Sequence, residues 1–203
     1  PGYPAFLAGV AIVFGRSIRA IVLSQVAFDL VTCILAATLS AALAPVNSRR
    51  AVAIAGLWLT ATCPFVANYS AAVLTEVLAT FLTMAAIACF AKDLSQQFKA
   101  SRQYSLLALL GAFLTGLATL VRPEMPLLIV VAIAVYTLRW WRFVSFGKTV
   151  LTGAAMAGAF LVPLAPWAVR NLITLHEVQI LAPRYATMSG EYAPVGYYAW
   201  NRT

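Results

Sequence analysis

The chain has 203 residues, of which 63% are hydrophobic and only 10% charged, and its formal net charge is +8. A mean hydropathy of +0.88, with apolar runs of roughly 15 to 25 residues, excludes a soluble globular domain and predicts an all-α polytopic membrane protein. The basic residues lie in short loops between these runs rather than in one stripe, so we predict no nucleic-acid partner.

The first seventeen residues are predicted to form a separate segment at the outer membrane surface. Their apolar stretch, 4–14, is too short to cross a hydrocarbon core about 30 Å thick, so we expect a helix that lies in the interface. The chain starts at Pro1 without an initiator methionine, and no signal sequence precedes the first apolar run. We therefore interpret the chain as an internal fragment of a longer protein.

Residues 18–169 are predicted to form a transmembrane helix bundle with six spans. We expect the spans at about 18–44, 50–67, 71–91, 104–121, 125–140 and 149–168.

Loop charge sets the predicted orientation of these spans. The loops 45–50, 92–103 and 139–148 hold a single acid, Asp93, and many bases, namely Arg49, Arg50, Lys92, Lys99, Arg102, Arg139, Arg142 and Lys148. The positive-inside rule places these loops in the cytoplasm, and Trp140 and Trp141 fit the aromatic belt there. Residues 170–203 would then begin an extracytoplasmic tail, and the short loops and many alanines suit a bacterial inner membrane.

Four polar clusters return to the predicted outer face, and they are Pro1–Pro4, Thr75–Glu76, Val121–Glu124 and Pro166–Asn171. Glu76 has two interpretations. It is either a helix-capping acid at the positive end of the dipole or a buried acid that faces a polar cavity.

Proline residues predict a tight outer turn around Arg122 and Glu124. Pro123 disfavours helix at Arg122, and Pro126 suits the first turn of the next helix. The two charges either neutralise each other or leave Arg122 to grip a phosphate bidentately.

Other charged residues carry weaker signals. Arg170 is either a snorkelling interface residue or a ligand-binding one, and Arg16 and Arg19 lie on the outer side against the positive-inside trend. His176 beside Glu177 is interpreted as a solvated loop pair rather than a metal site.

The cysteines Cys33, Cys63 and Cys89 are interpreted as small buried hydrophobes.

Small residues are dense in the predicted spans, as in Leu109–Ala112 and Thr152–Gly158. Such residues let membrane helices approach closely, and a groove for a long prenyl chain could lie beside the polar residues.

The polar clusters together resemble a known group of enzymes. Pro-Gly-Tyr-Pro, Thr-Glu at the head of a span, Gly-Leu-Ala-Thr-Leu-Val-Arg-Pro-Glu and Pro-Trp-Ala-Val-Arg-Asn occur in the order found in the GT-C superfamily of polytopic glycosyltransferases. The chain looks most like the bacterial branch related to protein O-mannosyltransferases and to the aminoarabinose transferase that acts on lipid A. The segment from Leu181–Tyr185 through Gly190–Tyr192 and Trp200–Arg202 also resembles tails found in this group.

The resemblance implies a membrane enzyme that moves a sugar from a polyprenyl-phosphate donor to a lipid, glycan or protein acceptor at the extracytoplasmic face. The catalytic acid of such enzymes lies in a first external loop that would precede this sequence, so the catalytic residues stay unknown and the chain alone is expected to be inactive.

Positive donors are needed where the departing phosphate gains charge. We expect Arg122 and Arg170, followed by Arg16 and Arg19, to bind the donor phosphate. Glu76 and Glu124 are expected to line a polar pocket, where they would orient these arginines, contact sugar hydroxyls or hold a divalent cation such as Mg²⁺ or Mn²⁺. No other cofactor is expected.

Three other functions stay open, namely another polyprenyl-carrier enzyme such as a polymerase or ligase, a membrane transporter and a structural subunit. A transporter typically places its polar residues near the bilayer midplane. The charges considered above gather at one face instead, and a structural subunit would have no need of Glu76 below the interface.

Overall fold

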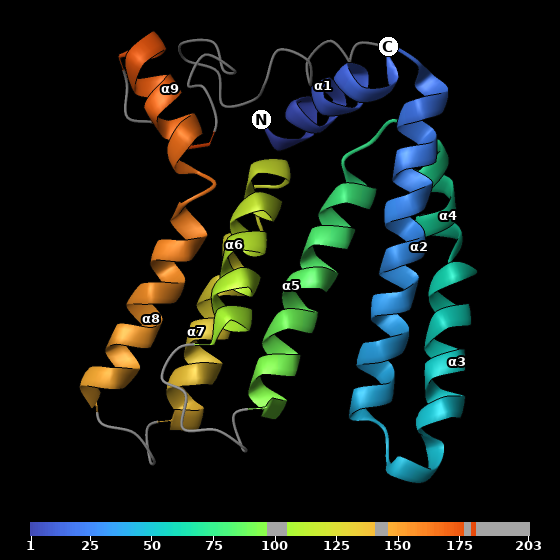
Figure 1. Ribbon diagram of the computed structural model, residues 1–203, viewed down its shortest axis with the longest axis vertical. Helices are drawn as coiled ribbons and strands as arrows, with labels where there is room; N and C mark the ends of the chain where they lie inside the picture. The colour runs from blue at the N-terminus through green and yellow to red at the C-terminus, as the bar shows by residue number, and fades with distance from the viewer. Residues whose placement is uncertain (97–104, 141–145, 177–179, 182–203) are drawn as a thin grey trace, which may run out of the picture. The chain divides into compact units, whose positions relative to one another are not determined.

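The computed structural model describes residues 1–96, 105–140, 146–176 and 180–181. All regular elements in these ranges are helical, which confirms the predicted all-α class (Figure 1). The α-helices are α1 (Gly2–Phe14), α2 (Ile18–Leu43), α3 (Arg49–Ala61), α4 (Pro64–Ala71), α5 (Glu76–Gln96), α6 (Leu106–Val121), α7 (Pro126–Trp140), α8 (Phe146–Leu161) and α9 (Ala165–Leu175), and one 3₁₀ turn, η1, covers Val46–Ser48.

The chain divides into two compact units, Pro1–Pro163 and Leu164–Thr203. The first unit holds α1 to α8, and the second holds α9. Each unit is described by itself below.

Helix boundaries in the first unit follow local chemistry. Gly15 ends α1 with a φ of 78°, a backbone conformation that favours glycine. The Ser105 hydroxyl accepts a hydrogen bond from the Leu107 amide at 3.2 Å and caps the start of α6. Arg122 is extended because Pro123 follows it, and α7 begins at Pro126, as predicted.

Two helices, α2 and α5, are long and apolar enough to cross a membrane, and a third span results if α8 and α9 are taken as one interrupted span. Six clear spans are not present in the ranges that the structure describes. The predicted span 50–67 is divided, because α3 ends at Ala61 and α4 begins at Pro64. A proline has no amide hydrogen to continue the preceding helix but fits the first position of a new one.

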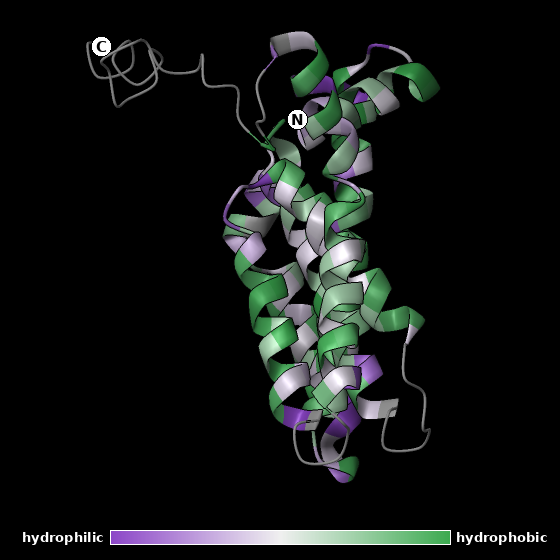
Figure 2. Ribbon diagram, turned by 90° about the vertical axis from the view of Figure 1, so that its left-hand side faces the viewer, coloured by the Kyte–Doolittle hydropathy of each residue, from purple (hydrophilic) through white to green (hydrophobic). Residues whose placement is uncertain are grey.

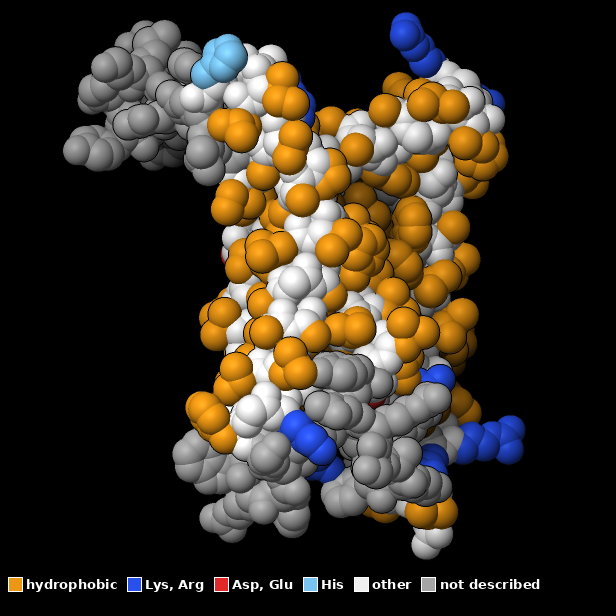
Figure 3. All heavy atoms as spheres, turned by 60° about the vertical axis from the view of Figure 1, so that its left-hand side comes forward, with side chains coloured by type: hydrophobic (Ala, Val, Ile, Leu, Met, Phe, Trp, Pro, Cys, Tyr) orange, Lys and Arg blue, Asp and Glu red, His pale blue; other side chains and the backbone are white. Residues whose placement is uncertain are grey.

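Helices α2 to α8 of the first unit run up and down, and α1 crosses one end of them at a steep angle (Figure 1). Hydrophobic residues dominate the middle of these helices, and hydrophilic residues lie toward their ends (Figure 2). Large hydrophobic side chains are exposed over much of the surface (Figure 3), including Leu23, Trp58, Leu59, Leu127, Val130 and Leu138. Such a surface is unfavourable in water, so these helices make the chain a candidate integral membrane protein.

A close helix contact lies between α6 and α8, at Gly116. A methyl group built on Gly116 would lie 2.5 Å from Pro163 Cγ and closer still to the Phe160 carbonyl oxygen. Gly111 on the same helix meets the ring of Phe90. Glycine therefore permits close packing on α6, as predicted for Leu109–Ala112. In Thr152–Gly158, a methyl group on Gly153 would lie 3.5 Å from Ile133 Cγ2 of α7, whereas Gly158 has open space beside it.

Asp93 lies in a helix rather than in the predicted loop 92–103. Helix α5 continues to Gln96, and Asp93 is only 1% exposed. Its Oδ2 accepts a hydrogen bond from the Tyr136 hydroxyl of α7 at 2.5 Å. The apolar run ends before Asp93, but a buried partner lets the helix extend beyond it, since a buried carboxylate is tolerated when it is hydrogen-bonded. The rest of that loop, with Lys99 and Arg102, and the loop residues Trp141 and Arg142 lie outside the described residues.

Candidate functional site

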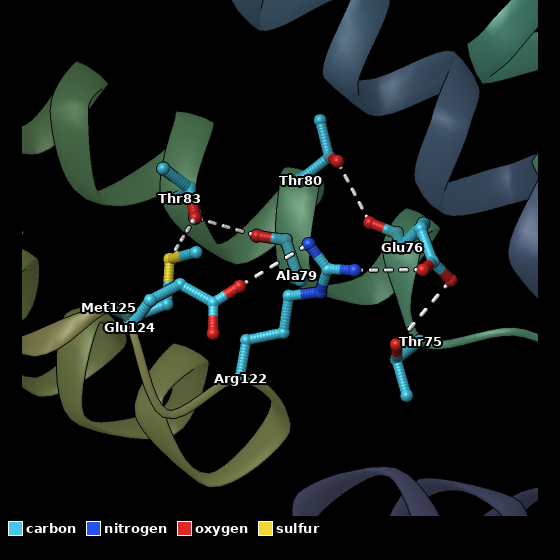
Figure 4. A network of polar contacts seen from close by, with 8 residues as sticks. All are labelled: Thr75, Glu76, Ala79, Thr80, Thr83, Arg122, Glu124 and Met125. Atoms are coloured by element: carbon cyan, nitrogen blue, oxygen red, sulfur yellow. Dashed lines mark hydrogen bonds and ion pairs between the residues drawn. The ribbon is translucent and has the colours of Figure 1, made fainter. Parts of the chain in front are cut away.

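An ion-paired cluster lies at the end of the first unit where α5 begins and α6 ends (Figure 4). The Arg122 guanidinium contacts Glu76 Oε1 at 2.8 Å through Nη2 and Glu124 Oε1 at 3.3 Å through Nη1. The Arg122 and Glu124 side chains are 37% and 56% exposed, whereas that of Glu76 is only 26% exposed. Arg122 therefore carries a tight pair with Glu76 and a looser one with Glu124.

The backbone positions all three charges. Glu76 is the first residue of α5, where a carboxylate is favoured by the helix dipole. Arg122 directly follows α6, and the turn that contains Pro123 carries Glu124. Both interpretations of Glu76 therefore hold in part, since it starts a helix and also binds an arginine 46 residues away. For Arg122, the ion pair with Glu124 is present, and the same guanidinium also pairs with Glu76.

Further polar contacts lie beside the cluster. The Thr75 hydroxyl donates to Glu76 Oε2 at 3.4 Å. The Thr83 hydroxyl donates a hydrogen bond to the Ala79 carbonyl oxygen at 2.7 Å, and its oxygen lies 3.3 Å from Met125 Sδ (Figure 4). Of these contacts, the one between Thr83 and Met125 links α5 to the α6–α7 turn.

Tyr3 of the Pro-Gly-Tyr-Pro cluster is buried near these charges. It packs with Leu78, Leu82 and Ala118, and a methyl group on Gly2 would touch Leu120 and Val121 at 3.0 Å. The Tyr3 hydroxyl has no hydrogen-bond partner among the described residues. Burial raises its pKa above the ordinary value, and the negative charge of Glu76 adds to that rise. Three of the four predicted clusters thus meet at one end of the first unit.

A second acid, Asp29, lines a pocket with Glu76. The pocket has a volume of about 180 Å³, and its walls come from α2, α4 and α5, namely Asp29, Thr32, Phe65, Tyr69, Glu76, Val77 and Thr80. Gln25, one helical turn before Asp29, donates from Nε2 to the Leu74 carbonyl oxygen at 3.0 Å. This bond sets the register that brings the middle of α2 beside the first turn of α5.

The sequence analysis overlooked Asp29, although the signal was present. A carboxylate inside a long apolar run is rare and points to a functional site. Its position within α2 alone would have indicated the middle of a span, but the Gln25 contact places it at the level of Glu76. Asp29 therefore adds to the polar end of the first unit.

Arg16 and Arg19 lie apart from Arg122. Arg16 follows the far end of α1, a helix whose thirteen residues span about 20 Å at 1.5 Å per residue. Arg16 lines a groove of about 740 Å³ between α1 and α2, whose other residues, such as Leu7, Ile12 and Ile18, are mostly apolar. Both arginines are exposed.

Arg170 belongs to the second unit and has local partners there. Its Nη1 donates to Asn171 Oδ1 at 3.0 Å, and its guanidinium lies 5.0 Å from the centre of the Trp167 ring. This cation–π contact fits an interface residue. His176 ends α9 with a φ of 53°, whereas Glu177 and most of the predicted tail, from 182 onward, lie outside the described residues.

A divalent-metal site does not fit the residues around Arg122. In the part of the chain that the structure describes, no three His, Cys, Asp or Glu side chains gather closely enough to hold a metal ion. Glu76 and Glu124 each bind the guanidinium instead. These two carboxylates therefore hold Arg122 in place.

No protein-family description, curated protein or solved structure matches this chain.

Proposed function

We propose that this chain is part of a membrane glycosyltransferase that takes a sugar from a polyprenyl-phosphate donor and passes it to an acceptor at the extracytoplasmic face. The observation that carries the proposal is the meeting of Tyr3, Glu76 and Arg122, from three motifs that resemble the GT-C superfamily, at one end of a hydrophobic helical unit. A lipid phosphate enters from the membrane with its headgroup at that level, so a cation at this end is suited to receive it.

The two carboxylates on Arg122 have different roles in this proposal. Glu76 makes the shorter contact and is less exposed, so it orients the guanidinium. Glu124 is more exposed and 3.3 Å away, so a donor phosphate displaces it and takes over Nη1. A guanidinium can bind two such oxyanions at once because its five N–H donors point in fixed directions.

The membrane arrangement in this proposal keeps the six expected spans. The pairs α3 with α4 and α8 with α9 each act as one interrupted span, and α6 and α7 are short spans that flanking residues extend. The end with Arg122 then faces the outside of a bacterial inner membrane, and the end with Arg49 and Arg50 faces the cytoplasm, in agreement with the positive-inside rule.

The test uses the full-length gene product in lipid nanodiscs with a panel of polyprenyl-phosphate sugars and a crude membrane extract as acceptor. Mass spectrometry measures the release of polyprenyl phosphate. We expect release with one donor class, loss of release in Arg122→Ala, and retention in Arg50→Ala, a matched arginine at the other end. No release with any donor, or equal release by Arg122→Ala, would refute the proposal.

A further inference from the structure

The pocket between α2, α4 and α5 has an unusual lining for so hydrophobic a chain. Five of its seven wall residues are polar, and two of those are carboxylic acids, Asp29 and Glu76. The volume of about 180 Å³ equals that of several water molecules at about 30 Å³ each. It is therefore large enough for a small organic group.

Most polar atoms of the pocket are available only as hydrogen-bond acceptors. The Thr32 hydroxyl donates to the Phe28 carbonyl oxygen at 2.8 Å, and the Thr80 hydroxyl donates to the Glu76 carbonyl oxygen at 2.8 Å. Each hydroxyl has one proton, so only lone pairs remain for a ligand. The carboxylates accept as well, and Tyr69 alone can still donate.

The charges of the pocket are only partly compensated. Arg122 is shared between Glu76 and Glu124, so these three residues together keep a formal charge of −1. Asp29 adds another negative charge. Its side chain makes no hydrogen bond or ion pair with the other described residues. A carboxylate inside an apolar helix without such a partner is unfavourable unless a ligand or water provides one.

We propose that this pocket binds a small primary ammonium group, with Asp29 as its counter-ion and the hydroxyls of Thr32 and Thr80 as acceptors. A primary ammonium has three N–H donors and no acceptor, which complements the two carboxylates and the hydroxyl oxygens of the lining. Phe65 and Tyr69 border the same pocket and cover the hydrocarbon part of the ligand.

Direct binding of methylammonium tests this site and does not rest on the proposed sugar transfer. The purified full-length protein in nanodiscs is titrated with radiolabelled methylammonium chloride at constant ionic strength, and bound label is counted. Asp29→Asn keeps the size of the side chain and removes its charge, so we expect affinity to fall by at least about tenfold, as for other lost hydrogen bonds to a charged group. Thr38→Val is the control and should leave binding unchanged, because Thr38 lies on the same helix but does not line the pocket.

Two further measurements decide the chemistry of the ligand. Tetramethylammonium has no N–H donor, so it should compete at least about tenfold more weakly than unlabelled methylammonium. Thr32→Val removes one acceptor without changing the charge and should weaken binding, which keeps the test decisive if Asp29→Asn does not fold. Equal binding by the Asp29 or Thr32 variant, or equal competition by sodium or tetramethylammonium, would overturn the assignment.

Discussion

The contact of Gly116 with α8 predicts a large difference between two similar substitutions. A methyl group on Gly116 would meet the Phe160 carbonyl oxygen and Pro163 Cγ, whereas one on Gly158 would meet nothing within 4 Å. Both glycines lie inside helices of the first unit, and Gly158 lies on α8 itself. Gly158→Ala is therefore the matched control for Gly116→Ala.

The expected magnitude follows from two terms. Replacing glycine by alanine inside a helix stabilises it by about 0.5–1 kcal/mol in both variants. Gly116→Ala also forces α6 and α8 apart by roughly 1 Å, because the obstructing atoms are backbone and proline ring rather than a flexible side chain, and such overpacking costs about 1–3 kcal/mol. The helix term cancels in the comparison, so Gly116→Ala should be less stable than Gly158→Ala by about 1–3 kcal/mol.

Thermal unfolding in detergent micelles, followed by far-ultraviolet circular dichroism, measures this difference. For a chain of this size 1 kcal/mol corresponds to roughly 2–4 °C in Tm, so the two variants should differ by about 2–12 °C. Equal Tm values for the two variants would refute the close approach of α6 and α8.

Three further predictions concern polar contacts of the first unit. Tyr136→Phe removes a donor to the buried Asp93 carboxylate and should lower the free energy of unfolding by about 1.5–3 kcal/mol; an unchanged value would contradict that contact. Tyr3→Phe removes a buried hydroxyl that has no partner among the described residues, so in the same assay stability should stay equal or rise, and a clear loss would reveal a missed partner. Glu124→Gln weakens the looser competitor for Arg122 and should increase binding of a polyprenyl phosphate severalfold, whereas Glu76→Gln should decrease it; the opposite order would reverse the assigned roles of the two acids.

Helix boundaries could be predicted from the sequence where a residue acts on its own backbone conformation. Pro123 and Pro126 fixed the end of α6 and the start of α7, because proline acts on its own backbone and on that of its neighbour. The same chemistry was overlooked at Pro64, where a run of apolar residues concealed a helix break. Hydropathy measures composition over a window, so it does not detect a break of two residues.

The candidate site could be predicted only in part. The sequence indicated that Glu76, Arg122 and Glu124 lie at one face, but their pairing depends on how α5 and the α6–α7 turn pack together. Asp29 was overlooked because its level in the bundle depends on the register of α2, which the Gln25 bond to Leu74 sets. The distance between Arg16 and Arg122 has a similar cause, since the length of α1 separates these two residues.

Helix α2 is longer than a bilayer's hydrocarbon core is thick. Its 26 residues extend about 39 Å at 1.5 Å per residue, against a hydrocarbon core of about 30 Å. Because Gln25 holds the helix beside Leu74, the first turns of α2 extend beyond the start of α5, and α1 precedes them. In a thicker membrane, lipid would surround more of these turns and α1 would lie among the acyl chains. In a thinner membrane, α1 would stay at the level of the headgroups. Access of water to Arg122 and Asp29 would then vary with the host membrane.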